Sequence, residues 1–302
     1  MSATAAGLQP SLRDQLISQS PFSLLSEQAA ESLLAAAILR RFPIGARLLR
    51  SDELPAEVLL VVSGEVRLLI TSGGEQFTLC KRGSGQLLGW SSLLRAEACE
   101  LVQASTEVVA VAFPGEHVVS LVRQQPEFAA FFAQLPGLHE AHAVAVAAAA
   151  LHPRLSSGWD ADLAQRSQAA FGATLIPGQP FAPPQGLPAE LDWFLSTAGV
   201  PDHPVGKWLE AGALLPPRPG FALPYRLVGL PRTPSLPASE QVVPVAGEAV
   251  ASKETRSTNL EALGILEDDH LNDGDRYPIV RGQGQLAEAL AVAEMVALQQ
   301  RV

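Results

Sequence analysis

The chain has 302 residues, of which 47% are hydrophobic and 17% are charged, and its formal net charge is −10. This length accommodates about two domains of ordinary size, and the composition provides enough apolar residues for a folded core. Because acidic residues outnumber basic ones, the charge balance argues against a broad positive surface of the kind that binds nucleic acids or anionic lipids. We therefore predict no nucleic-acid partner.

The two cysteines and the apolar runs bear on the cellular setting. Cys80 and Cys99 have a spacing that fits neither a disulfide framework nor a zinc site, so we expect buried free thiols. Residues 1–16 lack the apolar core of a signal peptide, and the run Ala143–Leu151 is far shorter than the roughly 20 residues that span a bilayer. We expect a cytoplasmic chain without direct membrane insertion, or one at the cytoplasmic face of an inner membrane as part of a larger protein.

Proline is distributed unevenly and indicates a boundary. Seven of the 24 prolines lie in residues 1–150, and the other 17 lie in residues 151–302. We predict an N-terminal tail or helix (1–20), a β-barrel domain (21–135), a connecting helix (136–152), a Pro-rich small helical region (153–234), a flexible linker (235–262), and a strand-like segment with a terminal amphipathic helix (263–302).

The first half of the chain has the pattern of an antiparallel β protein. Val58–Val62 is an apolar run typical of a buried strand, and Glu65–Ile70 alternates between apolar and polar residues. Turn residues such as Ser63-Gly64 separate these segments. Short strands at such spacing predict a barrel or jelly roll. The expected strands are 41–45, 46–50, 58–62, 65–70, 75–80, 86–88, 99–105 and 107–113.

Helical patterns flank the strands, so the predicted fold class is α+β. Ser26 is a candidate N-cap for a first helix, and Pro114 and Pro126 each suit the start of a further one. An Ala-rich helix follows at His139–Leu151. In the Pro-rich part we predict helices at 161–171, 187–197 and 205–213, the second being the best defined.

The stretch Gly85–Ser105, here called the cassette, is the candidate functional site. A strand runs into Gly89, a short apolar turn of helix follows, and a second strand begins near Cys99. Strand, glycine and helical turn together gather backbone N–H groups at a helix N-terminus, which is an arrangement that binds anions such as phosphate.

Several spaced motifs carry a family resemblance. They are Phe42-Pro43-x-Gly45, the apolar strand into Ser63-Gly64-x-Val66, and Gly83-x-Gly85-x-x-x-Gly89. On these motifs, residues from about Pro21 to Phe132 resemble the cyclic-nucleotide-binding domain of bacterial regulators and kinase regulatory subunits. The resemblance implies an antiparallel β jelly-roll barrel with flanking helices and a non-catalytic, regulatory role.

The resemblance also implies an altered ligand site. The family cassette reads Phe-Gly-Glu, an apolar turn and then Pro-Arg-x-Ala, with the glutamate on the ribose and the arginine on the cyclic phosphate. Here Trp90 stands at the glutamate position, Ala98 stands at the arginine position, and Glu100 adds a negative charge nearby. Losing the arginine forfeits about 1.5–3 kcal/mol of charge-assisted hydrogen bonding. We therefore expect a modified or lost site.

Alternatives for the ligand contacts stay open. Arg95 is either a substitute cation or a solvated loop arginine, and Trp90 either stacks on a flat ligand or packs in a core. Backbone groups near the serines could hold an anion alone. A cyclic nucleotide or another small anion is the candidate effector. The candidate binding residues are Gly89, Trp90, Ser91, Ser92, Arg95, Ala98 and Cys99.

A second resemblance covers the end of the chain. Asp275–Gly282, followed by an Ala/Leu-rich helix, is similar to the junction before the peptidase-like and transmembrane parts of some bacterial ABC exporters. It implies transmembrane and ATPase partners and a role in peptide or protein secretion. The alternatives are a transcription regulator of the cAMP-receptor class and a ligand-free scaffold, and a homodimer through the helices after the barrel is a further expectation.

Catalytic and metal motifs are weak. His139 and His142 have i, i+3 spacing on a helix but no third ligand is evident, and no nucleophile motif or phosphate-binding P-loop occurs. We predict neither an enzyme nor a metal site.

Overall fold

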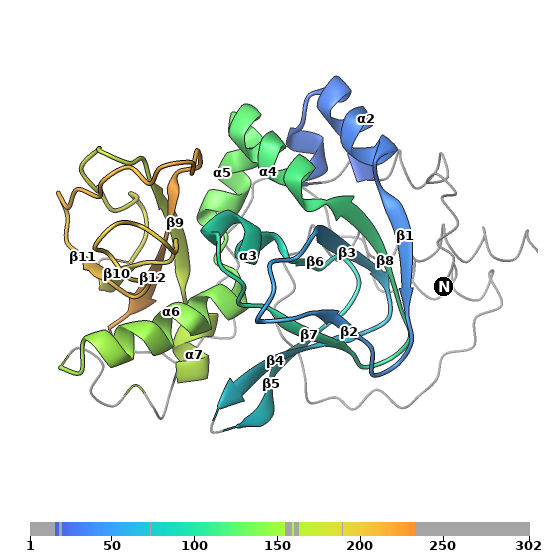
Figure 1. The fold of residues 1–302 in the computed structure, drawn as a ribbon, viewed down its shortest axis with the longest axis horizontal. Coiled ribbons are helices and arrows are strands. Elements are labelled where there is room, and N and C mark those ends of the chain that lie inside the picture. Colours follow the sequence, from blue (N-terminus) through green and yellow to red (C-terminus); the bar gives the residue numbers. More distant parts are fainter. Residues whose placement is uncertain are drawn as a thin grey trace, which may run out of the picture. The chain divides into compact units, whose positions relative to one another are not determined.

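The computed structural model describes residues 16–17, 20–72, 74–154, 159, 163–188 and 190–232 (Figure 1). The predicted linker and terminal segment, 235–302, lie outside the described residues, as does most of the N-terminal tail. The fold is α+β, as the sequence predicts, and its strands are antiparallel. Among the described helices, none is long and apolar enough to cross a membrane.

The barrel consists of two four-stranded sheets with the orders β1-β8-β3-β6 and β2-β7-β4-β5. Leu59 and Val61 from the first sheet share a buried cluster with Leu68 and Val102 from the second, so the sheets pack face to face. All the strands predicted for this half are confirmed within a few residues. They are β1 (Ile38–Phe42), β2 (Arg47–Leu49), β3 (Glu57–Ser63), β4 (Val66–Ser72), β5 (Glu75–Arg82), β6 (Leu87–Leu88), β7 (Leu101–Ala104) and β8 (Val108–Pro114).

Helices cover the outer face of the first sheet. Leu60 in β3 points away from the barrel interior and joins a second cluster with Leu33, Leu121 and Phe128, which lie on helices. Burial on both faces explains why β3 is a continuous apolar run. The side chain of Ser26 accepts a hydrogen bond from the Ala29 backbone, as its predicted N-cap role requires. The helices are η1 (Phe22–Leu24), α2 (Glu27–Ala35), α3 (Trp90–Arg95), α4 (Gly115–Gln124), α5 (Pro126–Gln134), α6 (Leu138–Leu151) and α7 (Leu163–Gln168).

The Pro-rich part contains a second antiparallel sheet rather than a set of helices. Its order is β11-β10-β12-β9, with β9 (Phe171–Leu175), β10 (Leu191–Leu195), β11 (Trp208–Leu209) and β12 (Tyr225–Pro231). The helix predicted at 187–197 is therefore wrong, and so is the one predicted at 205–213. The helix predicted at 161–171 is confirmed only as the short α7.

The error has a physical cause in β10. Trp193 and Leu195 face one buried cluster, while Phe194 faces another, so all five positions of the strand are buried. A strand covered on both faces loses its apolar–polar alternation, and its sequence cannot then be told from that of a buried helix by periodicity alone.

Small residues on α6 let the second sheet approach this helix closely. Ala141, Val144 and Ala148 on α6 share a buried cluster with Phe194 and Val228 of the sheet. This face of α6 therefore packs within the chain. The Ala-rich composition of the helix thus serves an intramolecular contact, and the homodimer stays a prediction.

Candidate functional site

The cassette folds as strand β6, a glycine turn and the short helix α3. Gly89 has φ +89°, and a side chain there would place a Cβ atom 2.9 Å from the Glu57 carbonyl oxygen. Only glycine satisfies both conditions. The turn brings the backbone nitrogens of Gly89 and Ser92 to the same acceptor side chain.

That acceptor is the side chain of Glu100. One carboxylate oxygen, Oε1, accepts a hydrogen bond from the Gly89 nitrogen at 2.9 Å, and Oε2 accepts from the Ser92 nitrogen at 3.1 Å and from Ser92 Oγ at 2.8 Å. Glu100 is only 5% exposed. The donors that the sequence predicts for an external anion are therefore used by a carboxylate of the same chain.

The serines and Cys99 complete this part of the cassette. Ser92 Oγ accepts a hydrogen bond from the Cys99 nitrogen at 3.2 Å while it donates to Glu100, so this hydroxyl bridges the two arms of the cassette. Burial raises the pKa of the Cys99 thiol to about 12, with the Glu100 carboxylate acting in the same direction. Cys99 is consequently a neutral thiol, and Ala98 beside it supplies no polar side chain.

Arg95 lies at the end of α3 and is 1% exposed. Its Nε atom donates to the carbonyl and hydroxyl oxygens of Ser196, both at 3.2 Å, and a terminal nitrogen lies 2.8 Å from a Glu97 carboxylate oxygen. The Ala198 nitrogen also donates to the Arg95 carbonyl at 2.9 Å. The interpretation of Arg95 as a solvated loop residue is therefore wrong, because its guanidinium joins the cassette to the second sheet.

Trp90 packs in the core, which was one of its two interpretations. Its ring centroid lies 5.1 Å from that of Phe132, and the guanidinium carbon of Arg226 lies over the Trp90 ring, 5.0 Å from the centroid. A cation at this distance from an indole is attracted by the ring. Since Arg226 belongs to β12, the cassette touches the second sheet a second time through Trp90.

The ion pair between Glu140 and Arg226 connects α6 to β12. Nε and Nη2 of Arg226 donate to the two carboxylate oxygens at 2.7 and 2.8 Å, and Ser196 Oγ donates to Glu140 at 2.7 Å. Arg226 also donates to the carbonyl oxygens of Phe132 and Leu135. Burial alone raises the pKa of Glu140, but the arginine charge and these hydrogen bonds outweigh it and hold the pKa below its usual value.

These contacts form one buried polar network that the sequence did not reveal. We call it the buried network, and its members are Trp90, Arg95, Glu140, Ser196 and Arg226. The available signals are isolated charges: Glu140 in an Ala-rich helix and Arg226 in an apolar strand. Such charges predict burial with a partner, but they do not identify it.

His139 lies on α6 beside the cassette. It is buried, its Nε2 atom lies 2.9 Å from the Leu69 carbonyl oxygen, and burial lowers its pKa despite the neighbouring Glu100 charge. Burial also lowers the pKa of His142. Over the described ranges, no cluster of three or more His, Cys, Asp or Glu side chains that could hold a metal ion occurs.

Comparison with known proteins assigns the barrel. Residues 39–125 match the family model described as the cyclic nucleotide-binding domain. The barrel is a cyclic nucleotide-binding domain. The match spans less than half of the chain and includes the whole of α3 and the cassette. The search of curated proteins found no match.

Several solved structures are similar to this chain over about 40% of its length. A regulatory protein from Silicibacter pomeroyi DSS-3 is 23% identical, with 40% of this chain and 56% of that one covered and a TM-score of 0.35. The sensor domain of the transcriptional regulator DNR from Pseudomonas aeruginosa is 18% identical, with 39% and 84% covered and a TM-score of 0.36. A regulatory subunit of a cAMP-independent protein kinase A from Trypanosoma brucei is 21% identical, with 39% and 48% covered and a TM-score of 0.31. The chain thus spans about half of the length of the Silicibacter and Trypanosoma proteins.

Proposed function

We propose that the chain is a non-catalytic regulatory module whose cyclic nucleotide-binding domain is held by its own Glu100 in place of an external phosphate. The observation that carries this proposal is the set of three hydrogen bonds from Gly89 and Ser92 to the buried carboxylate. A carboxylate and a phosphate oxygen are acceptors of the same kind, so Glu100 satisfies the donors that the family ligand would otherwise need.

The residues present do not fit a cyclic phosphate. An incoming phosphate has to displace Glu100, and each hydrogen bond to a charged group is worth about 1.5–3 kcal/mol. The displaced carboxylate would remain close to a second negative charge. Ala98 offers no cation in compensation, and the guanidinium of Arg95 is engaged by Glu97 and Ser196. Ordinary cyclic nucleotides therefore bind weakly or not at all.

The regulatory output of such a module is the contact between the cassette and the second sheet. Two side chains of α3, Trp90 and Arg95, contact Arg226 and Ser196 respectively. A movement of α3 therefore cannot leave the second sheet unaffected. With Glu100 in place, the barrel and the second sheet are held in one arrangement without a ligand.

The larger context of the module is an extension of this proposal. The resemblance at Asp275–Gly282 supports a place in the cytoplasmic region of a bacterial ABC-type peptide or protein exporter, with transmembrane and ATPase parts as partners. That segment lies outside the described residues. The part after α6 that the structure describes consists of the six-residue helix α7 and an antiparallel sheet, without a pair of helices in the described residues, which speaks against the alternative of a winged helix-turn-helix regulator. A ligand-free scaffold is the alternative that shares the same cassette geometry.

Calorimetric titration of the 302-residue chain tests the proposal. We expect no heat of binding with cyclic AMP or cyclic GMP at millimolar concentration. We expect Ala98→Arg combined with Glu100→Ala to create measurable binding, because the pair restores a cation and frees the backbone donors. Glu116→Ala, an exposed substitution on α4, is the matched control. Micromolar binding of either nucleotide by the unaltered chain would contradict the proposal.

A further inference from the structure

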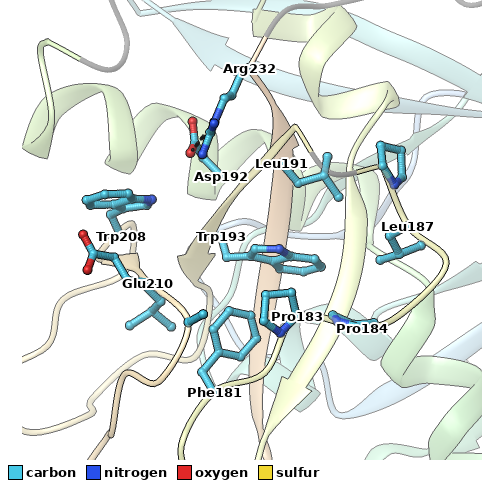
Figure 2. A pocket seen from close by; sticks show the side chains of 13 residues that line it. Phe181, Pro183, Pro184, Leu187, Leu191, Asp192, Trp193, Trp208, Glu210 and Arg232 are labelled. Atoms are coloured by element: carbon cyan, nitrogen blue, oxygen red, sulfur yellow. Dashed lines mark hydrogen bonds and ion pairs between the residues drawn. The ribbon is translucent and has the colours of Figure 1, made fainter.

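A groove of about 350 Å³ lies at the edge of the second sheet, where β10 and β11 meet the loop of residues 181–188 (Figure 2). None of its lining residues belongs to the cassette or to the buried network. The chemistry of this groove is therefore independent of the proposed function.

Flat apolar side chains form the walls of this groove. Figure 2 shows the Trp193 ring beside Pro183 and Pro184, with Trp208 on the opposite side. The Phe181 ring lies edge-on to Trp193, with 5.7 Å between centroids. Gly229 on β12 lets Trp193 lie across the sheet, since a Cβ atom there would stand 3.0 Å from the indole. Rigid aromatic and proline walls of this kind accept extended, proline-containing segments.

Beside the groove, β11 is shorter than β10. β11 pairs with β10 only at Trp193 and Phe194, so Leu191 and Asp192 extend beyond their partner on that side. The chain leaves the sheet after Leu209, and Glu210 and Ala211 line the far side of the groove. Leu191 and Asp192 are themselves buried, at 6% exposed each, so they form a closed part of the groove wall.

The charges at the groove are not balanced. The buried Asp192 carboxylate accepts from Nε of Arg232 at 3.0 Å, so these two charges compensate each other. The Glu210 carboxylate is exposed and forms no ion pair with any residue that the structure describes. The groove thus has one uncompensated negative charge next to Trp208, which favours a cation on the occupant.

From these three features we infer that the groove binds a short extended peptide segment with proline or leucine side chains and one arginine or lysine. The apolar side chains lie against Trp208, Pro183 and Pro184, and the basic side chain meets Glu210. This binding site goes beyond the proposed function, and it holds whether or not Glu100 fills the cassette.

The test is calorimetry with the full 302-residue chain and two blocked hexapeptides. The first is acetyl-Pro-Leu-Pro-Arg-Pro-Leu-amide, and the second has glutamate in place of the arginine. We expect the arginine peptide to bind in the micromolar-to-millimolar range and the glutamate peptide about tenfold more weakly, with the difference shrinking in high salt. Glu210→Gln should weaken binding of the arginine peptide about threefold, and Trp208→Ala should weaken it at least tenfold.

Because Glu210 is exposed, Glu210→Gln leaves the fold intact, and Glu116→Gln on α4 serves as its control. No binding of the arginine peptide at millimolar concentration would overturn the inference. Equal affinity for both peptides, or an affinity that Glu210→Gln leaves unchanged, would also overturn it. If Trp208→Ala instead changes the mass of the protein in solution, the groove is an interface between copies of this chain, and the peptide site is refuted.

Discussion

Oε1 of Glu100 accepts a hydrogen bond from the backbone nitrogen of Gly89 at 2.9 Å, at the glycine turn that opens the cassette. This contact joins two residues that are 11 positions apart in the sequence. It places a negative charge of the protein at the end of α3 where the family resemblance implies a phosphate. The first prediction follows from what this carboxylate contributes to the stability of the fold.

Glu100→Ala should lower the free energy of unfolding by at least about 1.5–3 kcal/mol, the contribution of one hydrogen bond to a charged group, because three buried donors lose this acceptor. Glu100→Gln should cost less, since its carbonyl oxygen still accepts from one of them. Urea unfolding of both variants measures the difference. The exposed Glu116→Ala should change the free energy by no more than about 0.5 kcal/mol. A cost for Glu100→Ala as small as that of the control would mean that the contact contributes nothing.

The buried ion pair between Glu140 and Arg226 gives a second prediction. Arg226→Met leaves the Glu140 charge without its partner, which costs about 3–5 kcal/mol and should lower Tm by roughly 6–20 °C. The double variant Glu140→Gln with Arg226→Met removes both charges and should recover part of that loss. Thermal unfolding followed by circular dichroism compares the unaltered chain, the single variants Arg226→Met and Glu140→Gln, and the double variant. Additive effects in the double variant would show that the two residues are not coupled.

Arg95 should control how tightly the cassette is joined to the second sheet. In Arg95→Met the hydrogen bonds to Ser196 are lost, while the apolar part of the side chain is kept. We expect faster amide hydrogen exchange at 196–198 and at 90–95, with little change in β3. Glu97→Gln is the control, because it removes only the half-exposed partner of Arg95. Unchanged exchange at 196–198 in Arg95→Met would contradict the role of this residue.

The stability of the protein should fall on mild acidification. His139 titrates below its usual pKa of 6.5 because it is buried, so below that pH the unfolded chain binds a proton that the folded chain excludes. Its contribution is therefore present above pH 6.5 and is lost as the pH falls through the lower folded-state pKa, and His142 acts in the same direction.

His139→Gln should flatten this dependence between pH 7 and pH 5. His203→Gln, at a histidine that lies in a surface turn, is the matched control. Urea midpoints measured across the pH range provide the comparison. A slope as steep in His139→Gln as in the unaltered chain would assign the effect to other groups.

The barrel could be predicted from the sequence because its signals are local. Gly64 and Gly89 occupy turns with positive φ, and the alternation in β4 records its one exposed and one buried face. The second sheet could not, because β10 is buried on both faces and lacks alternation. The strand that follows β10 in the chain and pairs with it, β11, is only two residues long, so it has no hydrophobic periodicity that could reveal it.

The cassette was predicted only in part, for a related reason. The sequence indicates that Glu100 lies near the cassette donors, but it does not indicate whether the side chain repels a ligand from outside or occupies the site itself. Arg226 and Glu140 are 86 positions apart, and nothing in either local sequence names the other. Contacts between residues so far apart in the sequence depend on how helices and strands pack, and local sequence patterns carry no information about that packing.

The most direct test of the central claim is the amide resonances of Gly89 and Ser92 in a 15N-labelled chain. If Glu100 holds these donors, both amide protons should resonate downfield, should not move on addition of cyclic AMP, and should shift upfield together in Glu100→Ala. Amide signals that are already upfield in the unaltered chain, or that move as cyclic AMP is added, would show that the donors are free for an external ligand.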